Sequence, residues 1–242
     1  MREIIILWLK KVRCIWLLIS SLFIALFTGC GEYDSPPAKM YYAYFPTHPG
    51  HFIIYQVDSV VYDGFTGQVL NFQYQVMQRI HSRFTDAEGR ESLRIERFYR
   101  PNSQVSWQTK DVWQARIHQG RLEKIEENNL FIKLVFPPHR GRTWNGNAYN
   151  TLPAMTFRIS EAHVPLMVNP NLRFDSTVTV LQNNLVTLIS EDVRRERFAK
   201  HVGMIERQHR VVRKNLAGVV TEGVDYSYRI VEYGTNPPQE IR

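Results

Sequence analysis

An alternation of apolar and polar side chains between Leu70 and His81 is the feature that most constrains what this chain can fold into. The side chains at 70, 72, 74, 76 and 80 are apolar, those at 71, 73, 75, 79 and 81 are polar, and Gln78 is the one break. A period of two residues is typical of a β-strand that buries one face. The apolar run 52–62 and the glycine-containing turn 63–67 precede this segment, and together they predict a β-hairpin.

The rest of the chain repeats this arrangement of short strand-like runs separated by turns, such as the turn 86–90 and the one at Gly120. The further predicted strands are 93–99, 105–109, 112–118, 121–125, 130–136, 155–163, 177–181, 185–189, 203–212 and 226–233. Successive strands joined by short turns form an antiparallel meander. The predicted fold class is therefore mainly β, with the meander arranged as a half-barrel, a barrel or a sandwich. The strands are too few and too irregular to favour a transmembrane barrel.

One segment, Ser190–Lys200, could form a helix. Ser190 could cap its first turn, and the two acidic residues that follow favour a helix start. The segment has little apolar face, so a charged turn fits it equally well. At most one or two short helices are expected in the whole chain.

The N-terminus has the layout of a secretory signal. Three cations between residues 10 and 13 precede the apolar run 15–27, which ends in small residues and a cysteine. The segment Leu26-Phe27-Thr28-Gly29-Cys30 resembles the lipobox of bacterial lipoproteins, although Leu is commoner than Phe27 at its position. An uncleaved transmembrane helix is the alternative, and it would place the three cations in the bilayer at a cost of a few kcal/mol each.

The lipobox resemblance implies cleavage after residue 29 and lipidation of Cys30. Cys14 lies inside the signal, so Cys30 would be the single cysteine of the mature chain, and neither a disulfide framework nor a cysteine zinc site can form. Lipoproteins of this kind acquire two or three acyl chains, which anchor them stably to a membrane. Gly31 stands where an inner-membrane retention signal often has Asp, which favours the outer membrane of the cell envelope and leaves the membrane face open.

The expected organisation is a signal peptide (1–29), a lipidated flexible tether (30–40), a single β-rich domain (41–234) and a loose C-terminal tail (235–242). The formal net charge of the chain is +7, of which the signal contributes four cations and one acid. The charge that remains is too small to indicate a nucleic-acid partner.

The loop 137–150 is the most distinctive candidate for a ligand site. Its candidate binding residues are Arg140, Arg142, Trp144, Asn145, Asn147 and Tyr149. An aromatic ring can stack on a sugar, amides can bond hydroxyl groups, and arginines can meet a phosphate or a carboxylate. The alternative is a structural connection between two β-layers, in which Trp144 plugs one end of the core.

Three weaker signals have mainly structural interpretations. His48 and His51 flank a proline and a glycine that exclude a helix, no third ligand lies nearby, and no metal site is predicted. The segment Glu196–Ile205 resembles one that recurs in uncharacterised β-rich secreted lipoproteins, and we expect it to serve folding, with Gly203 at a tight bend and Phe198 and Val202 in the core. The eight basic residues between 194 and 214 predict a solvated strand face, with contact to acidic headgroups or a polyanionic glycan as the alternative.

The chain lacks the sequence signatures of common enzymes. It has no nucleophile elbow, zinc-protease helix, phosphate loop or dinucleotide fingerprint. The predicted function is therefore that of a non-enzymatic envelope lipoprotein without a cofactor, whose β-domain binds an apolar or envelope ligand, since a closed β-structure with an apolar interior could hold an acyl chain. The alternatives are a structural or assembly component that docks on an envelope protein, and a glycan-acting hydrolase. The expected partners are the membrane, through the lipid anchor, and a lipid, a glycan or an envelope protein, but no nucleic acid.

Overall fold

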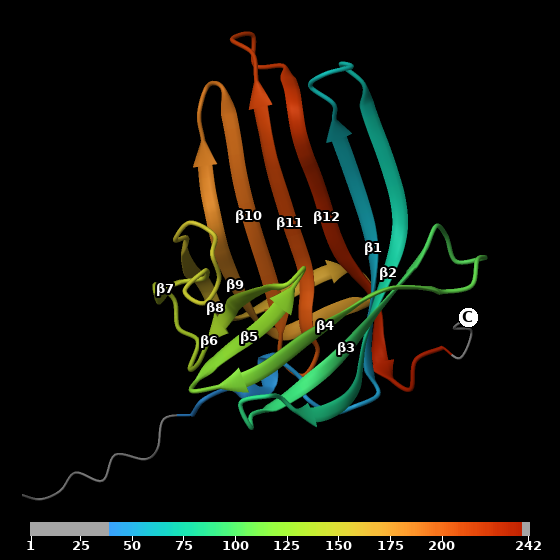
Figure 1. Cartoon of the computed structure of the whole chain (residues 1–242), viewed down its shortest axis with the longest axis vertical. Helices are drawn as coiled ribbons and strands as arrows, with labels where there is room; N and C mark the ends of the chain where they lie inside the picture. Colours follow the sequence, from blue (N-terminus) through green and yellow to red (C-terminus); the bar gives the residue numbers. More distant parts are fainter. Residues whose placement is uncertain (1–38, 239–242) are drawn as a thin grey trace, which may run out of the picture. The chain divides into compact units, whose positions relative to one another are not determined.

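The computed structural model describes residues 39–238, which build one antiparallel sheet of twelve strands (Figure 1). The strands are β1 (His51–Tyr62), β2 (Val69–Thr85), β3 (Glu91–Arg100), β4 (Gln108–His118), β5 (Arg121–Glu126), β6 (Asn129–Val135), β7 (Thr143–Asn145), β8 (Thr156–Asn169), β9 (Leu172–Val186), β10 (Ser190–Ala199), β11 (Gly203–Lys214) and β12 (Val220–Thr235). Within the described residues the one helical element is a 3₁₀ turn, η1 (Tyr42–Tyr44), and no helix there is long and apolar enough to cross a membrane. The mainly-β prediction is confirmed.

The sheet closes almost completely into a barrel. Every strand pairs with its neighbour in sequence except β6 and β7, and β1 also pairs with β12, so β6 and β7 are the two edges. Three hydrogen bonds join these edges: Ile132 N donates to Gly146 O (2.9 Å), Trp144 Nε1 donates to Ile132 O (2.8 Å), and Asn150 Nδ2 donates to Leu130 O (2.9 Å). We call this junction the β6–β7 seam. It leaves neither edge open as a template for another strand.

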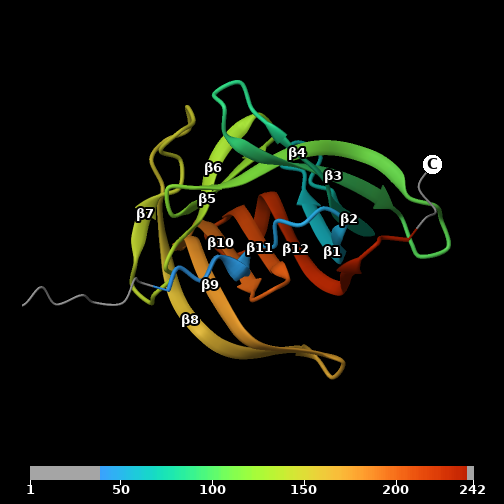
Figure 2. The ribbon, with the colours of Figure 1, turned by 90° about the horizontal axis from the view of Figure 1, so that it is seen from below.

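The barrel has a closed lower half and an open upper half. β1 pairs with the first part of β2, from Val69 to Arg79, whereas β3 pairs with β2 only from Gln75 onwards. The upper parts of β1, β2 and β9–β12 therefore extend beyond the short strands β3–β6, as Figure 1 shows. The 3₁₀ turn η1 lies at the lower end, seen from below in Figure 2. Its Tyr44 is fully buried, and the Tyr44 hydroxyl bonds His163 Nδ1 (2.8 Å) and Ser176 Oγ (2.7 Å).

The domain contains its own hydrophobic core. Residues Lys39–Arg242 form one compact unit, and all members of the core belong to it. A segment with a complete core of its own can fold alone. The predicted signal, Cys30 and all but the last two residues of the tether lie outside the described residues, as does the second half of the predicted tail.

The helical interpretation of Ser190–Lys200 is wrong, because the segment forms β10 and pairs with β9 on one side and β11 on the other. Glu196 and Phe198 are buried inside the barrel, while Arg197 is held at the outer face by Glu206 (2.6 Å). The side chains alternate as a strand requires. One of the interior positions is a carboxylate, so the apolar periodicity that marks a strand is missing from the sequence.

Two pairs of predicted strands are single strands. The segments 105–109 and 112–118 are replaced by β4, which begins at Gln108 and continues through Asp111, whose carboxylate accepts two hydrogen bonds from Arg97 on β3 (2.8 and 3.0 Å). The segments 177–181 and 185–189 are replaced by β9, and 187–189 is a turn. Charged or amide residues interrupt the apolar pattern between the two predicted segments in each case. The backbone hydrogen bonds to the neighbouring strand continue past them.

Candidate functional site

Five charged side chains meet inside the barrel where the closed half opens into the upper half. We call them the interior ion cluster: Lys124 and Glu126 on β5, Lys133 on β6, Glu196 on β10 and Arg207 on β11. Each is at most 11% exposed at its side chain. Three cationic groups therefore face two carboxylates in a space that the sequence alone suggested would be apolar.

Strand periodicity and register bring these residues together. Lys124 and Glu126 are two residues apart on β5 and share its inner face. Glu196 and Arg207 are directly opposite one another in the β10–β11 pair. In the sheet order β5 is far from β11, so closure of the barrel places these two strands across the interior from each other. The cluster thus exists only in the closed fold.

The ion pairs of the cluster are short and shared. Glu196 Oε1 accepts from Lys133 Nζ (2.6 Å) and from Arg207 (2.7 Å). Glu126 accepts from Arg207 (2.8 Å) and lies 3.3 Å from Lys124 Nζ and 3.5 Å from Lys133 Nζ. Glu196 Oε2 and Arg207 Nε are buried and have no hydrogen-bond partner within residues 39–238. The cluster therefore retains hydrogen-bonding capacity that the protein does not use.

The pKa shifts follow from burial and from this pairing. Burial opposes the charged form of Glu126 and of Glu196, but Arg207 and Lys133 outweigh it and hold the pKa of both carboxyls below its ordinary value. The pKa of Arg207 is raised by Glu126 and Glu196 against the effect of its burial. Burial lowers the pKa of Lys124 to about 8, with Glu126 opposing the shift. At neutral pH the cluster thus carries one more positive than negative charge.

A cavity of about 430 Å³ lies against the cluster, a volume within the range of sites for small ligands. Its charged side is formed by Glu126, Lys133, Arg194, Glu196 and Arg207, which are three cations and two carboxylates, whereas Lys124 of the cluster does not line it. Its other walls include Phe131, Leu152, Pro153, Ala154, Met155 and Phe157. Because 152–154 are exposed, this segment forms the mouth. The cavity therefore has an apolar side at its mouth and a cationic side at its inner end.

His209 and Tyr226 extend the cavity wall upwards from the cluster. Their rings stack with centroids 4.6 Å apart and planes 5° from parallel. Burial, followed by Arg194 and Arg207, lowers the pKa of His209 to about 4, so the imidazole is neutral at pH 7. The stacked pair presents a flat, uncharged surface to whatever occupies the cavity.

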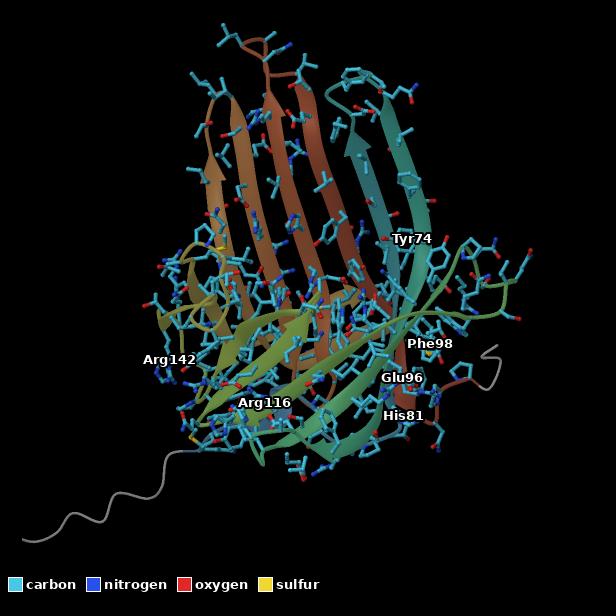
Figure 3. The ribbon with its side chains drawn as sticks, in the orientation of Figure 1. Tyr74, His81, Glu96, Phe98, Arg116 and Arg142 are labelled. Carbon is cyan, nitrogen blue, oxygen red and sulfur yellow. The ribbon has the colours of Figure 1, made fainter. Side chains whose placement is uncertain are left out.

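Apolar side chains continue from this pair along the inner face of the upper half. In the strand register Val61 lies opposite Leu70 and Val224, and Val224 lies opposite Val211. Val61 is on the same face of β1 as buried Val57, and Val224 is on the same face of β12 as buried Tyr228. These residues and their cross-strand partners therefore point to the inside of the barrel. Phe72, two residues from Leu70, shares this face and is 47% exposed. We call this surface the inner trough. In Figure 3, Tyr74, the next inward residue on β2, lies above Phe98, Glu96 and His81.

The six predicted ligand residues of the loop 137–150 do not converge on one point. Arg142, labelled in Figure 3, donates to Pro137 O (2.8 Å). Trp144 donates to Ile132 O in the β6–β7 seam. Asn145 Oδ1 accepts from the backbone of Asn147 (3.0 Å) and Met155 (3.1 Å).

The remaining three residues of that set differ in exposure. Asn147 is buried, donates to Pro153 O (2.7 Å) and lines the cavity. Tyr149 is 52% exposed with the Arg121 guanidinium 4.8 Å from its ring, and Arg140 is exposed. The loop thus closes the barrel by its side-chain hydrogen bonds, and only Asn147 among the six faces the cavity. Whether any of the six contacts a ligand stays a prediction.

The other sequence signals have structural roles. His51 is buried and its Nε2 bonds Val202 O (2.8 Å), and the described residues contain no group of three metal-ligating side chains. Phe198 and Val202 are in the core and Gly203 has φ 99° at the β10–β11 turn, as expected for 196–205, and the folding role of this segment stays a prediction.

Sequence reasoning missed the interior ion cluster, although the chain contains a signal for it. Arg207 and His209 occupy the same strand phase as the apolar residues Ile205 and Val211, and a charge in an apolar phase marks a polar interior. The prediction that the basic residues 194–214 form a solvated face is wrong for Arg207.

Comparison with known proteins adds a fold likeness. No protein-family model matches the chain, and no curated protein is significantly similar to it in sequence. Two crystal structures are similar: a protein predicted to be exported, with a YmcC-like fold, from Bacteroides fragilis (11% identity, TM-score 0.42, 78% of this chain and 98% of that one) and a predicted lipoprotein from Parabacteroides distasonis (12% identity, TM-score 0.42, 79% and 98%). At this level of likeness, function has to be argued from the geometry of the chain itself.

Proposed function

We propose that this chain is a non-enzymatic, lipid-anchored envelope protein whose β-domain binds an amphiphile with an acidic headgroup. The excess of cations over carboxylates in the charged lining of the cavity is the observation that supports this proposal. A carboxylate or phosphate there would meet Lys133 and Arg207, and Arg207 Nε is a free donor among the described residues. The apolar part of the ligand would lie against Phe131, Met155 and Phe157.

An acidic amphiphile fits the cavity better than a wholly apolar ligand. An acyl chain alone would leave the ions of the cluster facing a hydrocarbon, where charged groups are costly. An anionic headgroup instead balances the excess positive charge of the cavity lining. It also supplies a hydrogen-bond acceptor for Arg207 Nε. We therefore narrow the expected apolar or envelope ligand to one with an acidic end.

The geometry disfavours a glycan hydrolase. A glycosidase needs one carboxyl group whose pKa is raised, so that it can protonate the leaving group. Glu126 and Glu196 are the two carboxyls of the cavity, and cations lower the pKa of both. Neither is suited to act as the acid at neutral pH.

The anchor belongs to the same proposal. We assign lipidation to Cys30 and the location to the cell envelope, with the outer membrane favoured by Gly31. Mass spectrometry of the intact protein purified with detergent tests this, because a diacylated or triacylated Cys30 at the N-terminus is expected and an unmodified Met1 would contradict it.

Ligand binding is tested by native mass spectrometry of residues 39–242 and by displacement of a fluorescent fatty acid. Ala154→Trp should block the mouth of the cavity and weaken binding of the fatty acid at least about tenfold, since its bulk excludes the ligand. Ala148→Trp is the matched control, because Ala148 is exposed on the same loop but is not part of the cavity wall. Equal affinity of both variants and the wild type, or no binding of any acidic amphiphile, would refute the proposal.

A further inference from the structure

Three hairpin turns at the upper end of the domain each carry a large apolar side chain that is almost fully exposed. Phe65 in the β1–β2 turn is 97% exposed, Leu188 in the β9–β10 turn 85%, and Leu216 in the β11–β12 turn 94%. Figure 1 shows these turns together at the end opposite to the start of the described chain. We call the three residues the apolar tips. Single exposed apolar residues are ordinary, but three at the ends of adjacent hairpins form a common edge.

The backbone of these turns is hydrogen-bonded within each turn. Asp63 Oδ1 accepts from the N–H groups of Phe65 (2.8 Å) and Thr66 (3.2 Å). Asn215 Oδ1 likewise accepts from Ala217 and Val219 (3.0 Å each).

The third turn uses a hydroxyl in the same way. Thr187 Oγ1 accepts from Ile189 N (3.3 Å) and Ser190 N (2.9 Å). These internal bonds satisfy several N–H groups of each turn, which lowers the cost of moving the turn into a medium that offers few hydrogen bonds.

Of the charges nearest the tips, those behind the turns are in ion pairs, and the Asp63 carboxylate is held by backbone N–H groups. The segments 64–69, 187–189 and 215–219 contain no charged residue. Behind them Lys214 Nζ lies 2.9 Å from Glu191, and Arg213 lies 3.7 Å from Glu222. The edge therefore presents apolar side chains and one carboxylate, Asp63, without the cationic patch that attracts anionic lipids.

We propose that the apolar tips insert into the interface of a bilayer of zwitterionic lipids. A bilayer accepts three separate side chains at one level, whereas a stable protein interface needs a continuous surface of about 800 Å² on each partner. The self-contained hydrogen bonding of the turns has a use in lipid but not on a polar protein surface. The insertion does not depend on the cavity ligand, because no tip residue lines the cavity.

The test uses residues 39–242, which contain no cysteine, so that single cysteines can carry an environment-sensitive fluorophore. Ala217→Cys places the label in an upper turn next to Leu216, and Ala87→Cys places it in the β2–β3 turn at the lower end. Both alanines are exposed, which makes the pair a matched control. With phosphatidylcholine vesicles we expect a blue-shifted, brighter signal from position 217, no change from position 87, and no loss of the signal at high salt.

Substitution of the tips measures their contribution. Each of Phe65→Ser, Leu188→Ser and Leu216→Ser should weaken vesicle binding about tenfold, because a large apolar side chain then stays in water. Fatty-acid displacement by these variants should be unchanged, which separates failure of this inference from failure of the proposed function.

Three results would overturn the inference. They are equal signals from positions 217 and 87, binding that requires anionic lipid, and a tip-dependent change in oligomeric state without vesicle binding, which would assign the edge to a second copy of the chain.

Discussion

Removing the Arg207 guanidinium should destabilise the domain strongly at neutral pH and much less in mild acid. In Arg207→Met the carboxylates of Glu126 and Glu196 lose their shared partner at 2.8 and 2.7 Å. Breaking a buried ion pair from one side costs about 3–5 kcal/mol, because the remaining charge is buried without compensation. Since a domain is stable by only about 5–15 kcal/mol, the effect should be visible in any unfolding experiment.

The pH dependence distinguishes this reasoning from a simple packing defect. In the wild type the pKa of both carboxyls is lowered, so their stabilising contribution is present above the ordinary carboxyl pKa and is lost as the pH falls through the folded value. In the variant the effect of burial, which is the largest cause, is opposed mainly by the lysines, so we expect the pKa of both carboxyls to rise. The variant should then gain stability relative to the wild type as the pH falls from about 7 to about 5.

Urea denaturation of residues 39–242, followed by tryptophan fluorescence at several pH values, measures both effects. Arg213→Met is the matched control on the same strand: its side chain is 76% exposed, and its pair with Glu222 at 3.7 Å should contribute at most about 1 kcal/mol. Adding Glu196→Gln to Arg207→Met should restore part of the lost stability. A loss under about 1 kcal/mol for Arg207→Met, or a loss independent of pH, would contradict the assignment of a buried, ionised cluster.

Two further substitutions test how the barrel closes and bends. Trp144→Phe removes the donor to Ile132 O at 2.8 Å and should lower the free energy of unfolding by about 1 kcal/mol, measured by urea denaturation; no loss would mean that the β6–β7 seam does not depend on this bond. Gly223→Ala would place a Cβ atom 2.1 Å from Val211 O at φ +124°, so thermal unfolding should show a loss of at least about 2 kcal/mol, whereas Gly67→Ala, with open space around it, should lose about 1 kcal/mol; equal losses would contradict the assigned backbone.

The sequence predicted the strands well because apolar alternation reports which face of a strand is buried. The run 70–81 and the turn before it appear as β2 and the β1–β2 hairpin. The same rule fails at Ser190–Lys200, where the interior positions of β10 include Glu196. A carboxylate inside a barrel looks like a surface residue in the sequence, and only its partners Lys133 and Arg207 reveal why it can be buried.

The closure of the barrel could not be predicted from local patterns. The interior ion cluster joins β5 to β11 across the interior, with Glu126 and Arg207 separated by 81 positions. Local sequence periodicity marks Arg207 as a charge in an apolar phase, but it does not identify a partner on a strand so distant in the sequence. The loop 137–150 was singled out for its composition, and its amides and its indole serve the seam and the loop itself.

The cavity and the apolar tips are best interpreted together. The inner trough, with Leu70 and Phe72 about half exposed, runs between the tips and the interior ion cluster on the same face of the sheet. A ligand with an acidic end and an apolar tail could follow this face with its tail on apolar side chains throughout, while its headgroup approaches Arg207. A wholly apolar path would bind the tail but would offer no site for the headgroup. A wholly charged path would not bind the apolar tail. The change from apolar trough to cationic cluster therefore orients the ligand, with its headgroup towards Arg207. The ligand can reach the trough because the short strands β3–β6 leave the upper half open.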